Sequence, residues 1–269
     1  GLTGKNKAWE GYARKKDIVS GYFDNAGDFG TAALALENGK AKGIWFTLNP
    51  CKPALLARAK NRLVASPEAT TSDKDIQCLR WLPIDLDPVK PSEISATDDE
   101  IKPAEELGRN ITEKLEREDF GFPRGIRAFS GNGYHILYRL SDLANNDKHR
   151  ALIRKLVNAL VVTFPSDKVN IDEKVFNPAR IWKVYGTTGR KGDSTDDRPH
   201  RKSYLFPDTP KNLDEIDVLS QKQVGKLAAL IPDEDTAYSP APSTFSRKTD
   251  RQRGALSLMG NELGTLDVG

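Results

Sequence analysis

The segment Trp81-Leu82-Pro83-Ile84-Asp85-Leu86-Asp87-Pro88 places two carboxylates one residue apart at the end of an apolar run. In a β-strand, residues two positions apart point to the same face, so we expect Asp85 and Asp87 to project side by side from a sheet edge. Adjacent carboxylates repel each other unless a cation lies between them. A hard divalent ion such as Mg2+ or Mn2+, which takes oxygen ligands and commonly bridges to phosphates, is the natural occupant.

The acidic pair is not specific by itself, because the same triplet occurs in turns and in metal sites of unrelated enzymes, including nucleotide-sugar transferases and nucleases. A solvated strand end is the alternative interpretation. The position of the pair favours a site. The carboxylates follow Leu82 and Ile84, and Pro88 and Pro91 end the run, as expected at the carboxyl edge of a sheet.

The composition is that of a globular chain in a reducing compartment. At 269 residues the chain is long enough for one large domain or two small ones. No run approaches the roughly 20 apolar residues that span a bilayer, so we expect no membrane contact. Cys51 and Cys78 lie far apart, and there are only three histidines. We therefore expect no zinc site, no disulfide framework and a cytoplasmic location.

Periodicity and capping signals predict an α+β fold, with a mostly antiparallel sheet covered by helices. The predicted helices are 32–37, 53–61, 97–118 with Pro103 as a candidate break, 147–164 and 220–231. The predicted strands are 43–48, the run that ends at Asp87, 124–130, 134–140, 179–187 and 203–206. The turn Gly131-Asn132-Gly133 joins two of these strands into a hairpin.

Two later segments also carry polar residues in a pattern suited to a ligand. In Ser130-Gly131-Asn132-Gly133-Tyr134-His135 a histidine follows a glycine-rich turn, whose backbone can approach phosphates closely. A plain hairpin with a surface or core histidine is the alternative. Farther on, Ile171-Asp172 precedes Arg180, which heads an apolar strand where a guanidinium needs an anionic partner. The basic, glycine-containing stretch after Arg180 is either a solvated surface or a phosphate-handling loop.

Taken together, these segments resemble the archaeo-eukaryotic primase superfamily, and within it the bacterial, phage and CRISPR-associated primase-polymerases. That family has an acidic-x-acidic strand, then a Ser-x-His-like motif, then an apolar residue followed by aspartate. Here they stand in the same order as Asp85-Leu86-Asp87, Ser130 to His135, and Ile171-Asp172. One departure is that Ser130 and His135 are five residues apart rather than two. The resemblance covers about residues 43–204.

The resemblance implies a nucleotidyl transferase that uses two Mg2+ or Mn2+ ions. It assigns metal binding and catalysis to Asp85, Asp87 and Asp172. It assigns nucleotide binding to His135 and Arg180, with weaker candidates and turn residues beside them: Lys183, Lys191, Ser130, Asn132 and Gly133. Tyr138 is a candidate for reading the sugar, although an aromatic on a strand is more often part of the core.

The resemblance also implies an organisation and a set of partners. Residues 1–231 would form the catalytic domain, with an N-terminal α/β module to about residue 78 and an RRM-like catalytic module over 79–231. Residues 232–269 have the composition of a linker and flexible tail, after which a helicase or other domain would follow. Single-stranded DNA template, primer and NTPs or dNTPs are the expected partners, in a mobile element or CRISPR locus.

Two other functions fit part of the pattern. A replication initiator with a primase-like fold would bind DNA without synthesising it. A nucleotide-sugar transferase would use the acidic pair, but it explains neither the histidine turn nor Arg180.

Overall fold

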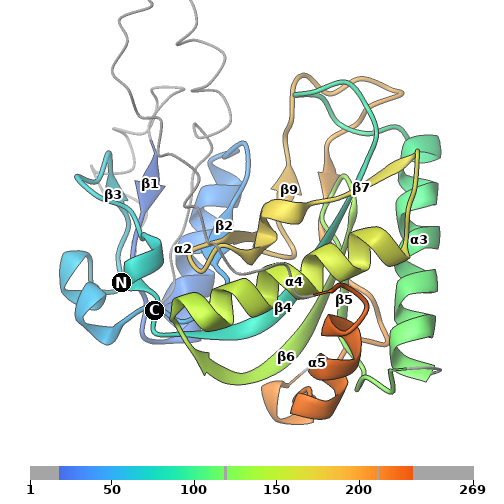
Figure 1. Ribbon diagram of the computed structural model, residues 1–269. Coiled ribbons are helices and arrows are strands. Elements are labelled where there is room, and N and C mark those ends of the chain that lie inside the picture. The colour runs from blue at the N-terminus through green and yellow to red at the C-terminus, as the bar shows by residue number, and fades with distance from the viewer. Residues whose placement is uncertain (1–17, 118–119, 211, 233–269) are drawn as a thin grey trace, which may run out of the picture.

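The computed structural model describes residues 18–117, 120–210 and 212–232 (Figure 1). Apart from Pro232, the predicted linker and tail lie outside these residues. Within the described ranges, no helix is both long and apolar enough to cross a membrane.

A five-stranded antiparallel sheet with the order β11-β5-β6-β4-β7 forms the centre of the molecule. Its main elements follow each other as strand, helix, strand, strand, helix, strand. They are β4 (Cys78–Pro88), α3 (Asp98–Arg117), β5 (Ile126–Phe129), β6 (Tyr134–Ala144), α4 (Asp147–Thr163) and β7 (Val169–Ile171), and the short edge strand is β11 (Tyr204–Leu205). This order is the split β-α-β arrangement, in which the first and third strands lie at the centre. The prediction of an α+β fold with an antiparallel sheet is confirmed.

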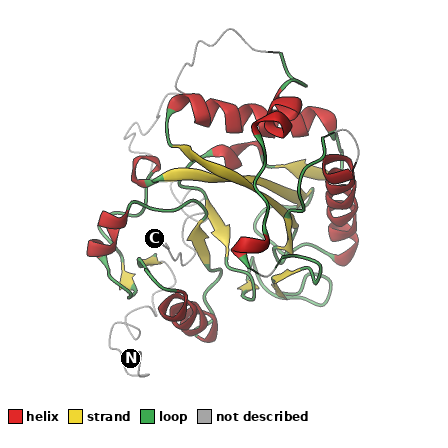
Figure 2. Ribbon diagram, turned by 90° about the horizontal axis from the view of Figure 1, so that it is seen from below, coloured by secondary structure: helices red, strands yellow, loops and turns green. Residues whose placement is uncertain are grey.

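Helices α3 and α4 cover one face of this sheet. Leu82, Ile84 and Leu86 of β4 are at most 1% exposed and share a core cluster with residues of α3 and α4. Figure 2 shows the long strands crossing the middle of the molecule, with a long helix along one side. Each such side chain contributes roughly 1.5–3 kcal/mol on burial. Because a slip of one residue would drive Asp85 and Asp87 into this core, packing fixes the register and leaves the carboxylates on the other face.

The other face of the sheet meets a two-stranded ribbon. Strand β2 (Trp45–Thr47) pairs antiparallel with β8 (Ile181–Lys183), and Trp182 stacks against His135 of β6. One strand of the ribbon comes from the predicted N-terminal module and the other from the predicted catalytic module. The boundary near residue 78 therefore remains a prediction.

Smaller elements complete the described chain. They are β1 (Val19–Ser20), α2 (Ala26–Asn38), the 3-10 turn η2 (Pro53–Arg58), β3 (Val64–Ala65), η3 (Asp73–Asp75), η4 (Glu173–Phe176), β9 (Thr188–Gly189), β10 (Arg201–Lys202), η5 (Leu213–Glu215) and α5 (Gln221–Ala228). The predicted helix starts at 97 and 220 are capped: the Ser220 side chain caps α5, and at the start of α3 the side chains of Thr97 and Glu100 each accept the other's backbone N–H.

Three local predictions need correction. Of the predicted helix 53–61, only Pro53–Arg58 is helical, as a short 3-10 helix, because Ala59 leaves helical geometry at φ −162°. Helix α3 continues through Pro103, whose missing N–H removes only a bond to the exposed first turn. The predicted strand 179–187 is reduced to β8, since the chain turns away at Gly186, which has φ +90°.

Candidate functional site

The acidic pair lies near the end of the central strand β4, on the face away from α3 and α4. Asp85 stands directly opposite His135 of β6, and Asp87 stands opposite Asn170 of β7. The Asp85 side chain is 14% exposed. The sequence prediction that the two carboxylates share one face agrees with this register.

A hydrogen-bonded chain of aromatic residues holds His135 against Asp85. The Trp182 indole N–H donates to the Tyr185 hydroxyl at 2.7 Å, and that hydroxyl lies 2.9 Å from His135 Nδ1. The Tyr185 oxygen accepts from the indole, so its own hydrogen is available to Nδ1, while Nε2 faces Asp85. Nε2 lies 3.2 Å from Asp85 Oδ1. His135 is 5% exposed and its ring centre is 4.2 Å from that of Trp182.

The two carboxylates have opposite pKa shifts. Repulsion from Asp85, followed by burial, raises the pKa of Asp87 to about 6. Burial also favours the neutral form of Asp85, but His135, Arg180 and Lys191 outweigh it and lower the Asp85 pKa below its ordinary value. The pair therefore carries a charged carboxylate beside one that gains a proton easily.

A divalent cation fits the chemistry of this pair. Asp85 Oδ1 is buried and accepts no hydrogen bond of good geometry, so this oxygen is available as a metal ligand. A cation between the carboxylates would also remove the repulsion that raises the Asp87 pKa. In the described part of the chain, however, no three His, Cys, Asp or Glu side chains are grouped as a metal site.

The side chain of Asp172, the third predicted metal ligand, does not join the acidic pair. The backbone N–H of Asp172 donates to the Asp85 carbonyl at 2.9 Å, so the two residues are neighbours through the main chain. The Asp172 side chain, however, accepts from the Lys174 N–H at 2.8 Å and forms an ion pair with Arg180. Asp172 and Arg180, predicted to bind a metal and a triphosphate respectively, are bound to each other.

The glycine turn lies against the acidic strand. A side chain at Gly133 would place its Cβ 2.4 Å from the Leu86 carbonyl oxygen, so only glycine allows this approach. Ser130 accepts the Gly133 N–H at 2.9 Å. Asn132 is 5% exposed and accepts the Ala96 N–H at 2.8 Å. The polar groups of Ser130 and Asn132, predicted to meet a nucleotide, are thus engaged in shaping the turn and docking a neighbouring loop.

Two further predicted residues lie away from the pair. Tyr138 is three positions after His135 and therefore points to the opposite face, where it is fully buried and donates to Glu116 at 3.1 Å. Lys183 is 5% exposed, donates to the Thr188 carbonyl at 3.1 Å, and burial lowers its pKa to about 8. Lys183 neighbours Trp182 on β8 and so points away from His135.

Lys191 does belong with the pair, since its charge lowers the pKa of both Asp85 and Asp87. Tyr185 and Trp182 are not among the predicted site residues. Both lie in the predicted strand 179–187, but only the long-range pairing of β2 with β8 turns them toward His135.

A cavity of about 450 Å3 lies on the same face, beside Tyr185. Phe46, Trp81 and Leu137 contribute apolar walls, and Thr209 and Asn212 contribute polar atoms. This volume lies in the range of small-molecule sites.

No protein-family model matches the sequence, and no curated protein is significantly similar to it. The geometry and the chemistry of the residues therefore carry the functional argument.

Proposed function

We propose that this protein is a DNA primase-polymerase, a divalent-metal-dependent nucleotidyl transferase that copies single-stranded DNA from NTPs or dNTPs. The observation that carries the proposal is the acidic pair on the central strand, with His135 directly across from Asp85. The order of the strands supports an RRM-like catalytic core of the archaeo-eukaryotic primase type. In an RRM sheet the two central strands present one face to nucleic acid; here Trp182 of the ribbon stacks on that face beside His135, next to the acidic pair.

Each residue of the site has a separate role in this proposal. Asp85 and Asp87 hold Mg2+ or Mn2+, which, when bound, lowers the pKa of the attacking 3′-hydroxyl and neutralises charge on the triphosphate. His135, fixed by Tyr185, keeps Asp85 oriented and lies beside the incoming triphosphate. The cavity beside Tyr185 offers room for the nucleoside.

Asp172 and Arg180 have a paired role in this proposal. Their ion pair is 25–28% exposed, so solvent and ligands reach it. A triphosphate is a stronger partner for a guanidinium than one carboxylate, because it presents several charged oxygens. Arg180 exchanges Asp172 for the triphosphate, and the Asp172 carboxylate, whose backbone is already bonded to Asp85, becomes available to the metals.

Primer synthesis and primer extension with labelled nucleotides on single-stranded DNA test the proposal. The wild-type protein is expected to incorporate nucleotide with Mg2+ or Mn2+ and to stop when EDTA is added. Asp85→Ala combined with Asp87→Ala is expected to abolish incorporation, because it removes the carboxylates that would hold the metal. The matched control is Glu113→Ala with Asp147→Ala, which removes two exposed charges elsewhere. Incorporation that survives loss of the acidic pair would refute the assignment.

One observation favours a second function. With Asp172 bound to Arg180, the acidic pair has no third carboxylate among the described residues, which suits a replication initiator that binds DNA without synthesis. DNA binding that does not depend on divalent metal, together with no incorporation, would support that alternative.

A further inference from the structure

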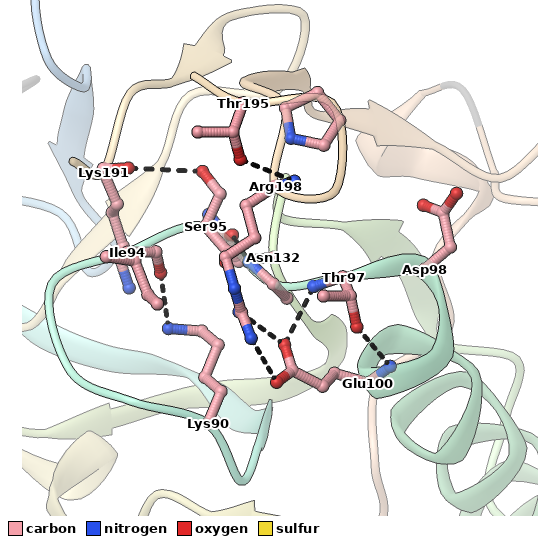
Figure 3. Close-up of polar contacts among 12 residues, drawn as sticks. Lys90, Ile94, Ser95, Thr97, Asp98, Glu100, Asn132, Lys191, Thr195 and Arg198 are labelled. Carbon is pink, nitrogen blue, oxygen red and sulfur yellow. Dashed lines mark hydrogen bonds and ion pairs between the residues drawn. The ribbon is translucent and has the colours of Figure 1, made fainter. Parts of the chain in front are cut away.

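Two loops are bound to each other just beyond the acidic pair (Figure 3). One follows β4 and runs over residues 89–97, and the other runs over residues 190–200. The Ser95 hydroxyl donates to the Lys191 carbonyl at 3.3 Å, and Arg198 donates to the Ser95 carbonyl at 2.8 Å. Arg198 also forms a two-point bond with Glu100 at 2.8 and 2.9 Å. Fork-like pairs of this kind fix geometry more strongly than single contacts.

Lys90 lies in the first loop, three residues after Asp87. Its ammonium donates to the Ile94 carbonyl at 2.8 Å and is half-buried. An ammonium has three N–H donors, so two remain for a ligand. Burial and the nearby Lys191 and Arg198 charges lower the Lys90 pKa, and Asp87 opposes them. Lys90 is therefore held in position close to Asp87, and two of its ammonium N–H groups remain available to a ligand.

Lys191 approaches the same space from the second loop (Figure 3). Its backbone is fixed by Ser95, while its ammonium has no hydrogen-bond partner in the described part of the chain. The Lys191 charge acts on Lys90 as well as on Asp85 and Asp87. The two lysines thus repel each other across a space that borders the carboxylates.

With a divalent cation on the acidic pair, this region would carry an excess of positive charge. Glu100 and Arg198 neutralise each other. When Asp85 and Asp87 share a divalent cation, their two negative charges are cancelled, and the ammonium groups of Lys90 and Lys191 remain as two uncompensated positive charges. Two ammonium groups beside a bound metal ion would suit a metal-bound polyphosphate.

We propose that Lys90 and Lys191 form the polyphosphate subsite of the nucleotide, with the Arg198–Glu100 pair as the positioning contact that holds the two loops together. The proposal rests on the proposed function and specifies how its substrate lies. The phosphate chain extends beyond Asp87 toward the start of α3, and the nucleoside extends the other way, toward Tyr185. Lys90 then has a binding role. Its position just after the acidic strand is also compatible with a solvated surface lysine.

Calorimetric titration of the full chain with Mg2+-ATP, and separately with adenosine, tests the subsite. Lys90→Gln keeps an N–H donor for the Ile94 carbonyl but removes the charge, and Lys191→Gln removes the other charge. Each is expected to weaken Mg2+-ATP binding about tenfold and adenosine binding less than twofold, as expected for loss of one charge-assisted hydrogen bond. Lys90→Arg and Lys191→Arg are expected to recover most of the affinity. Lys60→Gln, an exposed lysine paired with Asp24, is the matched control.

The outcomes separate this subsite from the function on which it rests. Mg2+-ATP affinity within twofold of wild type in both glutamine variants would overturn the subsite, even if the wild type incorporates nucleotide normally. Equal weakening of ATP and adenosine would overturn it too, because a phosphate contact cannot act on adenosine. Charge-dependent ATP binding without any incorporation by the wild type would support the subsite and refute the polymerase.

Discussion

Replacement of Asp87 by asparagine is expected to stabilise the metal-free protein while abolishing nucleotide incorporation. Repulsion from Asp85, followed by burial, raises the Asp87 pKa from 3.8 to about 6. A difference of one unit between the folded and unfolded pKa corresponds to about 1.4 kcal/mol, so ionised Asp87 destabilises the fold by at most about 3 kcal/mol. Nearby water and lysines screen this repulsion. We therefore expect Asp87→Asn to raise the free energy of unfolding by about 1–2 kcal/mol at about pH 8.

The sign of the pH dependence follows from linkage. A carboxyl group whose folded pKa is raised contributes stability that is fully present below its unfolded pKa, here 3.8, and lost as the pH rises through about 6. Asparagine does not titrate. The advantage of Asp87→Asn over the wild type should therefore be near zero at about pH 4 and complete at about pH 8.

Urea unfolding in EDTA, followed by circular dichroism at both pH values, measures this difference. Added Mn2+ should stabilise the wild type and not the variant, because a ligand stabilises only the state that binds it. Asp147→Asn, at a side chain 85% exposed, serves as the control. A variant less stable than wild type at about pH 8, or a gain equal at both pH values, would refute the repulsion argument.

Three further substitutions have definite expected outcomes. Burial raises the pKa of Glu37, but its bonds with Arg190 and Thr188 outweigh this and lower it to about 2; Glu37→Gln should lose about 1–2 kcal/mol of stability at neutral pH. In urea unfolding that loss should shrink as the pH falls below 4.5 toward about 2, and a loss independent of pH would contradict the ion pair. Gly133→Ala should destabilise by about 1–3 kcal/mol because its Cβ meets a carbonyl at 2.4 Å, whereas Gly30→Ala in α2, with open space around it, should stabilise by up to about 1 kcal/mol; equal effects on the unfolding midpoint would exclude a steric cause. Tyr138→Phe removes a buried hydrogen bond and should cost about 1 kcal/mol, and in competition assays the preference between ribose and deoxyribose should not change; a changed preference would return Tyr138 to the nucleotide site.

Local chemistry in the sequence predicted the framework of the site. The apolar run before Asp85 identified β4, and the predicted helices 97–118 and 147–164 correspond to α3 and α4, which cover one face. These signals depend on residues a few positions apart, and the period-two rule then placed Asp85 and Asp87 on one face. The pairing of Asp85 with His135 follows once β4 and β6 are neighbours.

Contacts between distant segments could not be read in the same way. The ribbon of β2 and β8 brings Trp182 and Tyr185 to His135. No local sequence pattern predicts that these two strands, so far apart in the chain, pair with each other. The ion pair of Asp172 with Arg180 is a choice between partners, which depends on side-chain positions rather than on residue type. Lys183 points away from His135 because of the orientation of the ribbon. Tyr138, in contrast, lies three positions after His135 on one strand, so the period-two rule alone places it on the opposite face.

Anomalous diffraction from crystals grown with Mn2+ and a non-hydrolysable nucleoside triphosphate tests the central claim most directly. We expect a manganese peak at the carboxylates of Asp85 and Asp87, with Arg180 released from Asp172 and the phosphates at Lys90 and Lys191. Manganese bound elsewhere, or a triphosphate that binds without contact to the acidic pair, would contradict it.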